Sequence, residues 1–272
     1  NLYGMLGQHD KSLLHFRRAV SIDPACVGAW TLLGHEYLEV HNTSAAVSAY
    51  RTAVTLDERE YRAWYGMGQI YELLQLFPYA LHYYQKTTAL RPGDARMWVA
   101  TAGCLEKLCR PRDAVACLER AAQCESTASD NYATTLRRIA QHCASTDPTR
   151  AATAYKSLLA APRCKPQEAA EAQLFLVAHY CDCADAALEL PPAAARAPSF
   201  DPYQHDPARG SGGSGRSQGK PSFDSRRDEA AGWLRMAESL LEDLVGSIGD
   251  HAATVAARRA RLDRLRRVLD GR

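Results

Sequence analysis

Three glutamates recur at nearly equal steps along the chain, at Glu39, Glu72 and Glu106. Carboxylates that line one surface can pair with an arginine guanidinium through two parallel hydrogen bonds, which are stronger than neutral ones. The pattern therefore suits the binding of an extended peptide that brings an arginine. A solvated acidic stripe without any ligand explains the three carboxylates equally well on charge alone.

Two further side chains share the predicted helix face of Glu72. Tyr65 and Gln69 precede it by seven and three residues, a spacing typical of one side of a helix. We expect Tyr65 to form a wall of the peptide site and Gln69 to supply an amide contact. His35 occupies the position of Gln69 one repeat earlier, and completes the candidate peptide-binding set.

Motifs for catalysis, for a cofactor and for a metal are missing from the sequence. It contains no phosphate-binding glycine loop, nucleophile elbow, zinc-protease helix or dinucleotide fingerprint. The nine cysteines include a group whose spacings of five, eight and seven residues do not match the close pairs of a zinc site. This group is Cys104, Cys109, Cys117 and Cys124. We expect reduced core thiols and a protein that is not an enzyme.

A period of 34 residues places the candidate side chains. It aligns columns of tryptophan, glycine and tyrosine, among them Trp30, Trp64 and Trp98, Gly34 and Gly68, and Tyr50 and Tyr84. Within each unit these residues fall at helical spacing on two successive helices. This is the tetratricopeptide (TPR) pattern, which predicts an all-α, right-handed superhelix of stacked helix pairs. The first helix of each pair, which carries the candidate residues, lines the concave groove.

The period also divides the chain. A TPR array is predicted over 1–190, as a half repeat at 1–26, full repeats at 27–60, 61–94 and 95–128, a degenerate repeat at 129–164 and the start of a sixth from 167. The Gly- and Pro-rich stretch 191–228 is typical of a flexible, disordered insert. Helices return over 229–270, to complete the sixth repeat and to cap the array. The chain opens without Met inside a helical pattern, so we expect a fragment that packs on further repeats upstream.

The overall charge excludes some partner classes. A net charge of +2 in 272 residues favours neither nucleic acid nor a membrane surface. The last predicted helix carries six arginines, at Arg258, Arg259, Arg261, Arg264, Arg266 and Arg267. An acidic partner would use them, but no aromatic residues interleave, and we interpret them as the solvated face of a capping helix.

Four stretches resemble one protein family more closely than the repeat alone requires. They are LGQHDKSLLHFRRAVSIDP at 6–24, GAWTLLGHEYLEVHNTSAAVSAYR at 28–51, YRAWYGMGQIYELLQLFPYALHYYQK at 61–86 and LRPGDARMWVATAGCLEKL at 90–108. The family is the TPR scaffold subunit of the anaphase-promoting complex, or cyclosome, usually called subunit eight. The resemblance is dense to about residue 125 and looser to about 185, and the Gly/Pro insert departs from it.

This resemblance implies a non-catalytic role in a multi-subunit ubiquitin ligase of the cell cycle, in the nucleus and cytoplasm. The implied partners are other subunits of the complex and the C-box of a coactivator, a segment with an essential arginine. The family forms homodimers through N-terminal repeats that are absent here. A generic TPR adaptor of a co-chaperone or transport complex is the alternative. A chaperone-type groove would present Lys, Arg and Asn to a terminal carboxylate, whereas this one presents Thr31, His35, Tyr65 and Gln69.

Overall fold

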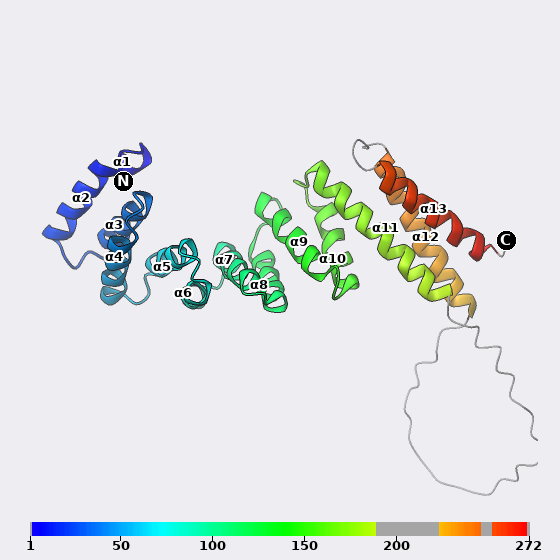
Figure 1. Ribbon diagram of the computed structural model, residues 1–272, viewed down its shortest axis with the longest axis horizontal. Helices are drawn as coiled ribbons and strands as arrows, with labels where there is room; N and C mark the ends of the chain where they lie inside the picture. The colour runs from blue at the N-terminus through cyan, green and yellow to red at the C-terminus, as the bar shows by residue number, and fades with distance from the viewer. Residues whose placement is uncertain (1, 189–222, 246–251, 271–272) are drawn as a thin grey trace, which may run out of the picture. The chain divides into compact units, whose positions relative to one another are not determined.

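The computed structural model describes residues 2–188, 223–245 and 252–270, and these ranges contain helices and no strand (Figure 1). The predicted all-α class is confirmed. The chain divides into two compact units, 1–164 and 165–272. The first unit contains α1 (Leu2–Met5), α2 (His9–Ile22), α3 (Val27–Glu39), α4 (Thr43–Leu56), α5 (Tyr61–Leu73), α6 (Phe77–Leu90), α7 (Ala95–Lys107), α8 (Pro111–Cys124), α9 (Asp130–Cys143) and α10 (Pro148–Ala160). The second contains α11 (Pro166–Leu188), α12 (Phe223–Val245) and α13 (Ala252–Leu269).

The first unit is a stack of helix pairs. α3 packs on α4, α5 on α6, α7 on α8 and α9 on α10, and the second helix of each pair packs on the first helix of the next (Figure 1). One pair alone cannot bury both of its apolar faces, and stacking with a neighbour covers them. The first helices of successive pairs therefore lie side by side, which lines up the candidate residues on α3, α5 and α7.

Glycine and tyrosine set the separation of the helices within a pair. A Cβ at Gly68 would lie 2.5 Å from the Tyr84 ring, so only glycine leaves room for that ring. Gly34 has the same relation to Tyr50, at 2.4 Å. Both rings are almost completely buried. Tyrosine on the second helix thus fills the space that glycine opens on the first.

The tryptophan column ties the start of each first helix to the turn before it. Each indole N–H donates to a backbone carbonyl six residues earlier. The bonds join Trp30 to Pro24 (2.8 Å), Trp64 to Glu58 (2.9 Å) and Trp98 to Pro92 (2.8 Å). An indole N–H that is half-buried needs such a partner, and the repeated bond fixes the direction in which each pair follows the last.

The turn within each of the first four pairs, from α1–α2 to α7–α8, has one backbone conformation. The residue two places after the first helix has a positive φ in four successive pairs, at Gly7 (70°), His41 (58°), Gln75 (60°) and Cys109 (56°). In each case the next N–H reaches back to a carbonyl five residues earlier, as at Leu76 to Tyr71 (2.8 Å). This is the left-handed helix cap that favours glycine, yet only the first of the four turns has glycine at this position.

Side chains cap several helices, and one predicted boundary differs in the structure. Asp94 caps α7 by accepting from Arg96 N, and Asn42 caps α4 by accepting from Ala45 N. α12 begins at Phe223, six residues before the predicted return of helix. The remainder of the predicted insert, 191–222, lies outside the described residues. The division of the chain into repeats and insert stays a prediction.

The second unit is a group of three helices. α11 packs along α12, and α13 packs on both of them. The arginine-rich α13 is held partly by ion pairs, because Arg261 binds Asp182 (2.7 Å) and Asp185 of α11, and Arg266 binds Glu238 of α12. These two arginines serve internal contacts of the unit. None of the described helices combines the length and apolarity that crossing a bilayer requires.

The cysteines divide between core and surface. Cys104, Cys143 and Cys181 are buried, and burial raises the pKa of the Cys104 thiol to about 12. Cys109 and Cys124 are exposed. The expectation of core thiols therefore holds for the buried three and is wrong for Cys109 and Cys124, which lie at or just beyond a helix end.

Candidate functional site

A groove runs along the first helices of the pairs in the first unit, and two arginines line it. Arg62 and Arg96 stand one repeat apart, each two residues after the acidic residue that caps its helix. The Glu60 carboxylate accepts from the backbone N–H of Arg62 (3.1 Å) and from its Nε (2.8 Å). Asp94 holds Arg96 in the same way. The guanidinium hydrogen bonds lower the pKa of the Glu60 and Asp94 carboxyls. Each of the two arginines that line the groove is therefore paired with an ionised carboxylate.

The middle of the groove, here called the central hollow, has a volume of about 450 Å³ and opens between α5, α7 and α9. Tyr65, Gln69 and Glu72 line it from α5, as the sequence predicts for side chains on one helix face. The opposite side carries Arg96, Val99, Ala100 and Gly103 of α7, and Asn131, Thr134, Thr135 and Arg138 of α9. Glu125, beyond the end of α8, and Tyr84 complete the lining. Small residues on α7 leave the space into which the α5 side chains project.

Glu72 is oriented by the core of its own pair. The hydroxyl of Tyr84 donates a 2.6 Å hydrogen bond to Oε2 of Glu72. Burial, and after it this carboxylate, raise the pKa of Tyr84, so the phenol stays protonated and remains the donor. Among the described residues none donates a hydrogen bond to Oε1 of Glu72, which leaves that oxygen for a ligand.

Glu106, predicted as a carboxylate for a peptide arginine, is already paired within the chain. It accepts a 2.8 Å ion pair from Nη2 of Arg138 and lies 2.8 Å from Nε2 of His142, both on α9. Burial raises its pKa, but the hydrogen bonds from Arg138 and His142 outweigh burial and lower the pKa overall. Arg138 and His142 therefore occupy Glu106, and a peptide arginine would have to displace them.

His35 lies in a smaller adjoining hollow of about 170 Å³, here called the His35 hollow. Its Nδ1 is 2.7 Å from the hydroxyl of Tyr50. Burial lowers the pKa of His35, and Arg62 lowers it further, so the imidazole is neutral near pH 7 and serves as a polar wall. Tyr65 and Arg96 line both this hollow and the central one. Glu39 is exposed and lines neither of them.

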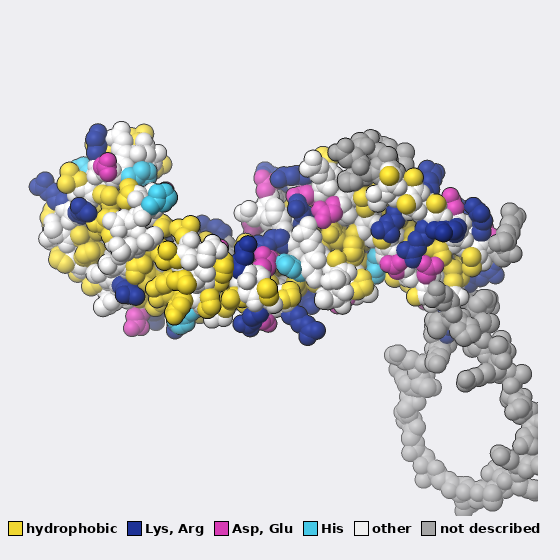
Figure 2. All heavy atoms as spheres, viewed as in Figure 1, with side chains coloured by type: hydrophobic (Ala, Val, Ile, Leu, Met, Phe, Trp, Pro, Cys, Tyr) yellow, Lys and Arg dark blue, Asp and Glu magenta, His cyan; other side chains and the backbone are white. Residues whose placement is uncertain are grey.

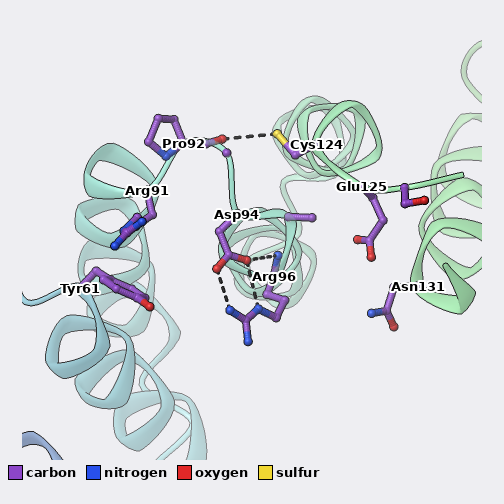
Figure 3. Close-up of a pocket in the computed structure, with 11 residues that line it drawn as sticks. Tyr61, Arg91, Pro92, Asp94, Arg96, Cys124, Glu125 and Asn131 are labelled. Atoms are coloured by element: carbon purple, nitrogen blue, oxygen red, sulfur yellow. Dashed lines mark hydrogen bonds and ion pairs between the residues drawn. The ribbon is translucent and has the colours of Figure 1, made fainter.

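A third hollow, of about 680 Å³, lies where α5, α7 and α9 begin, and is here called the turn hollow (Figure 3). Arg91 stacks over the ring of Tyr61, with its guanidinium carbon 4.7 Å from the ring centroid. Glu125 and Asn131 lie across the hollow from that stack (Figure 3). Arg96 lines all three hollows, so they form one continuous groove around its side chain.

Sequence reasoning missed the groove residues that come from the loops between pairs and from α9. Arg91 and Glu125 lie in the loops between pairs, and Asn131 and Arg138 lie on α9, where the repeat is degenerate. Among the described residues no group of three or more histidine, cysteine or acidic side chains could hold a metal ion.

Comparison with known proteins identifies the repeat. A family model described as tetratricopeptide repeat matches residues 31–95. The crystal structure of YrrB, described as a TPR protein with an unusual peptide-binding site, superposes with a TM-score of 0.52 over 90% of this chain and 97% of that one, at 15% identity. At such identity the likeness concerns the fold alone. The fold is an all-α TPR solenoid.

Curated relatives match shorter stretches at higher identity. Anaphase-promoting complex subunit 8 of Arabidopsis thaliana is 49% identical over 45 residues, which are 16% of this chain and 8% of that protein. Anaphase-promoting complex subunit 3 of Schizosaccharomyces pombe is 26% identical over 110 residues, which are 40% of this chain and 16% of that protein. The chain thus spans less than a fifth of the length of these relatives.

Proposed function

We propose that this chain is part of a non-catalytic TPR scaffold subunit of the anaphase-promoting complex, of the subunit-eight type. The observation that supports this most is the 49% identity to a subunit 8 over 45 residues, against 26% to a subunit 3 over a longer stretch. The protein assembles neighbouring subunits for ubiquitination in the cell cycle, in the nucleus and cytoplasm. The full-length protein forms a homodimer through repeats upstream of this chain.

The scaffold also docks an arginine-bearing coactivator segment in its groove. Glu72 is the receiving carboxylate, because Tyr84 holds one of its oxygens and leaves the other toward the central hollow. Tyr65 supplies an aromatic wall over which a guanidinium can stack, and Gln69 an amide that can bond the peptide backbone. Glu106 supports the site indirectly, through Arg138.

Calorimetry with a C-box-type peptide and its Arg→Ala twin tests the docking. We expect binding of the arginine peptide only, weakened about tenfold or more by Glu72→Gln, since a charge-assisted pair contributes more than a neutral hydrogen bond. The matched control is Glu39→Gln, an exposed glutamate outside the hollows, which should bind as the unmodified chain does. Equal binding of both peptides, or none, would contradict docking in this groove.

Purification of the full-length protein from its own cells tests the scaffold role separately. We expect the other subunits of a ubiquitin ligase to accompany it in fixed ratio, with and without Glu72→Gln. Recovery with chaperones or transport factors instead would reject the assembly, whatever the peptide experiment shows. Calorimetry with a peptide that ends in a C-terminal carboxylate motif tests the chaperone-type alternative. We expect this peptide not to bind.

A further inference from the structure

The turn between α5 and α6 exposes apolar side chains on the outside of the solenoid. Leu73 and Tyr79 are 62% and 61% exposed, and Leu76 is 43% exposed. Figure 2 shows hydrophobic side chains gathered over α5 and α6 on the face toward the viewer. None of these three residues lines any of the three hollows. This surface, residues 73–79, is here called the apolar turn.

The backbone of the turn does not require these side chains. The preceding and following pairs make the same turn, with the same positive φ and the same reach-back hydrogen bonds. At the positions of Leu73, Leu76 and Tyr79 the preceding turn has Glu39, Asn42 and Ala45, and the following one has Lys107, Arg110 and Asp113. The position of Leu74 is apolar in all three turns, because Val40 and Leu108 are its equivalents. An apolar residue there is thus common to the three turns. The extra apolar residues are therefore specific to this repeat.

Tyr79 of the apolar turn belongs to an aromatic stack. The ring of Tyr79 stacks on that of Tyr71 at 5.7 Å between centroids, and Tyr71 stacks on Tyr83 at 5.1 Å with an interplanar angle of 5°. Leu73, Leu74, Leu76 and Tyr79 are 62%, 49%, 43% and 61% exposed. Four side chains make a patch much smaller than the roughly 800 Å² that each partner of a stable dimer buries. A single bound helix therefore fits the patch better than a second copy of this chain.

The next turn along the same edge is cationic. Lys107 and Arg112 are exposed, and neither has a carboxylate partner among the described residues. Asp113 is occupied by Arg110, whose Nε donates to it at 2.8 Å. A helix laid from the apolar turn toward α8 would thus meet two uncompensated positive charges.

We propose that the apolar turn and the cationic turn beside it dock one acidic amphipathic helix of another protein. Its apolar residues cover Leu73, Leu76 and Tyr79, and carboxylates at its far end pair with Lys107 and Arg112. Such a helix presents anchors one turn apart to an exposed apolar surface. This docking surface lies outside the groove, so it does not depend on peptide binding in the groove.

Site-specific photo-crosslinking of the full-length protein in its own cells tests this. p-Benzoylphenylalanine in place of Tyr79 should crosslink a segment of a different protein with apolar residues at helical spacing and a cluster of Asp or Glu, identified by mass spectrometry. The same probe in place of Ala45, the equivalent position one repeat earlier, is the matched control and should not. A crosslink to a second copy, to a segment without carboxylates, or none at all would overturn the proposal.

Two double variants separate the contributions. Leu73→Glu with Leu76→Glu should lower the crosslink yield about tenfold, because few apolar anchors carry most of such a contact. Lys107→Glu with Arg112→Glu should lower it severalfold, whereas Arg18→Glu on α2 should leave it unchanged. Circular dichroism melts should match the unmodified protein, since every altered side chain is exposed. An undiminished crosslink in both double variants would also reject the proposal.

Discussion

Tyr84 links the core of the α5–α6 pair to the groove, because its buried ring lies against Gly68 and its hydroxyl donates a 2.6 Å hydrogen bond to Glu72. The tyrosine column is a packing feature of the repeat, yet its hydroxyl sets the direction of a side chain on the binding face. In the next pair Leu118 replaces the tyrosine, and Glu106 has no such donor from its own pair. It is held by α9 instead.

Tyr84→Phe should therefore affect binding more than folding. The ring stays in place, and the lost hydrogen bond costs about 1 kcal/mol of unfolding free energy. Glu72 loses its orientation, so the arginine peptide should bind less tightly. Urea unfolding and calorimetry on the same sample measure the two effects, with Tyr79→Phe at an exposed ring as the control. Unchanged peptide affinity would mean that the hydroxyl does not orient the binding carboxylate.

Glycine at position 68 should be required for the close packing of α5 on α6. Gly68→Ala puts a methyl 2.5 Å from the Tyr84 ring, and such overpacking costs about 1–3 kcal/mol. Gly28→Ala, also a helical glycine, meets nothing within 4 Å and should stabilise its helix by up to about 1 kcal/mol. Chemical denaturation of the two variants should give changes of opposite sign. A tolerated Gly68→Ala would mean that Tyr84 leaves its position at little cost.

Cys109→Gly should stabilise the protein. Cys109 has φ 56°, a conformation that costs residues with a Cβ about 1 kcal/mol relative to glycine. We expect a gain of about 0.5–1 kcal/mol in unfolding free energy, which thermal or urea denaturation can measure. Gly7→Ala, at the same turn position with φ 70°, is the reverse experiment and should destabilise. A loss of stability in Cys109→Gly would show that the exposed thiol side chain has a structural contact of its own.

Glu106 should contribute to the acid sensitivity of folding. Its pKa in the folded chain lies below the ordinary value, so its contribution to stability is fully present above about pH 4.5 and is lost as the pH falls through the lowered pKa. Melting temperatures of Glu106→Gln between pH 6 and pH 3 should fall less steeply than those of the unmodified chain. Glu60 and Asp94 have lowered pKa values too, so part of the slope should remain. Identical slopes would contradict the pairing with Arg138 and His142.

The sequence was sufficient for those features that depend on one helix or one turn. The period of 34 places Trp30, Trp64 and Trp98 in equivalent positions, because the apolar face of a helix is a local pattern. Helical spacing likewise predicts that Tyr65, Gln69 and Glu72 face the same way, and they line one hollow. Their role in binding stays a prediction.

Contacts between repeats were decided only by the tertiary structure. A period identifies the side chains that share a helix face, but an ion pair depends on what the neighbouring helix presents. Glu106 looked equivalent to Glu72 in sequence, yet Arg138 and His142 reach it from α9, where the repeat is degenerate. Likewise the apolar turn at 73–79 has the same backbone as its neighbours, so only the solvent exposure of Leu73 and Tyr79 distinguishes a surface from a core.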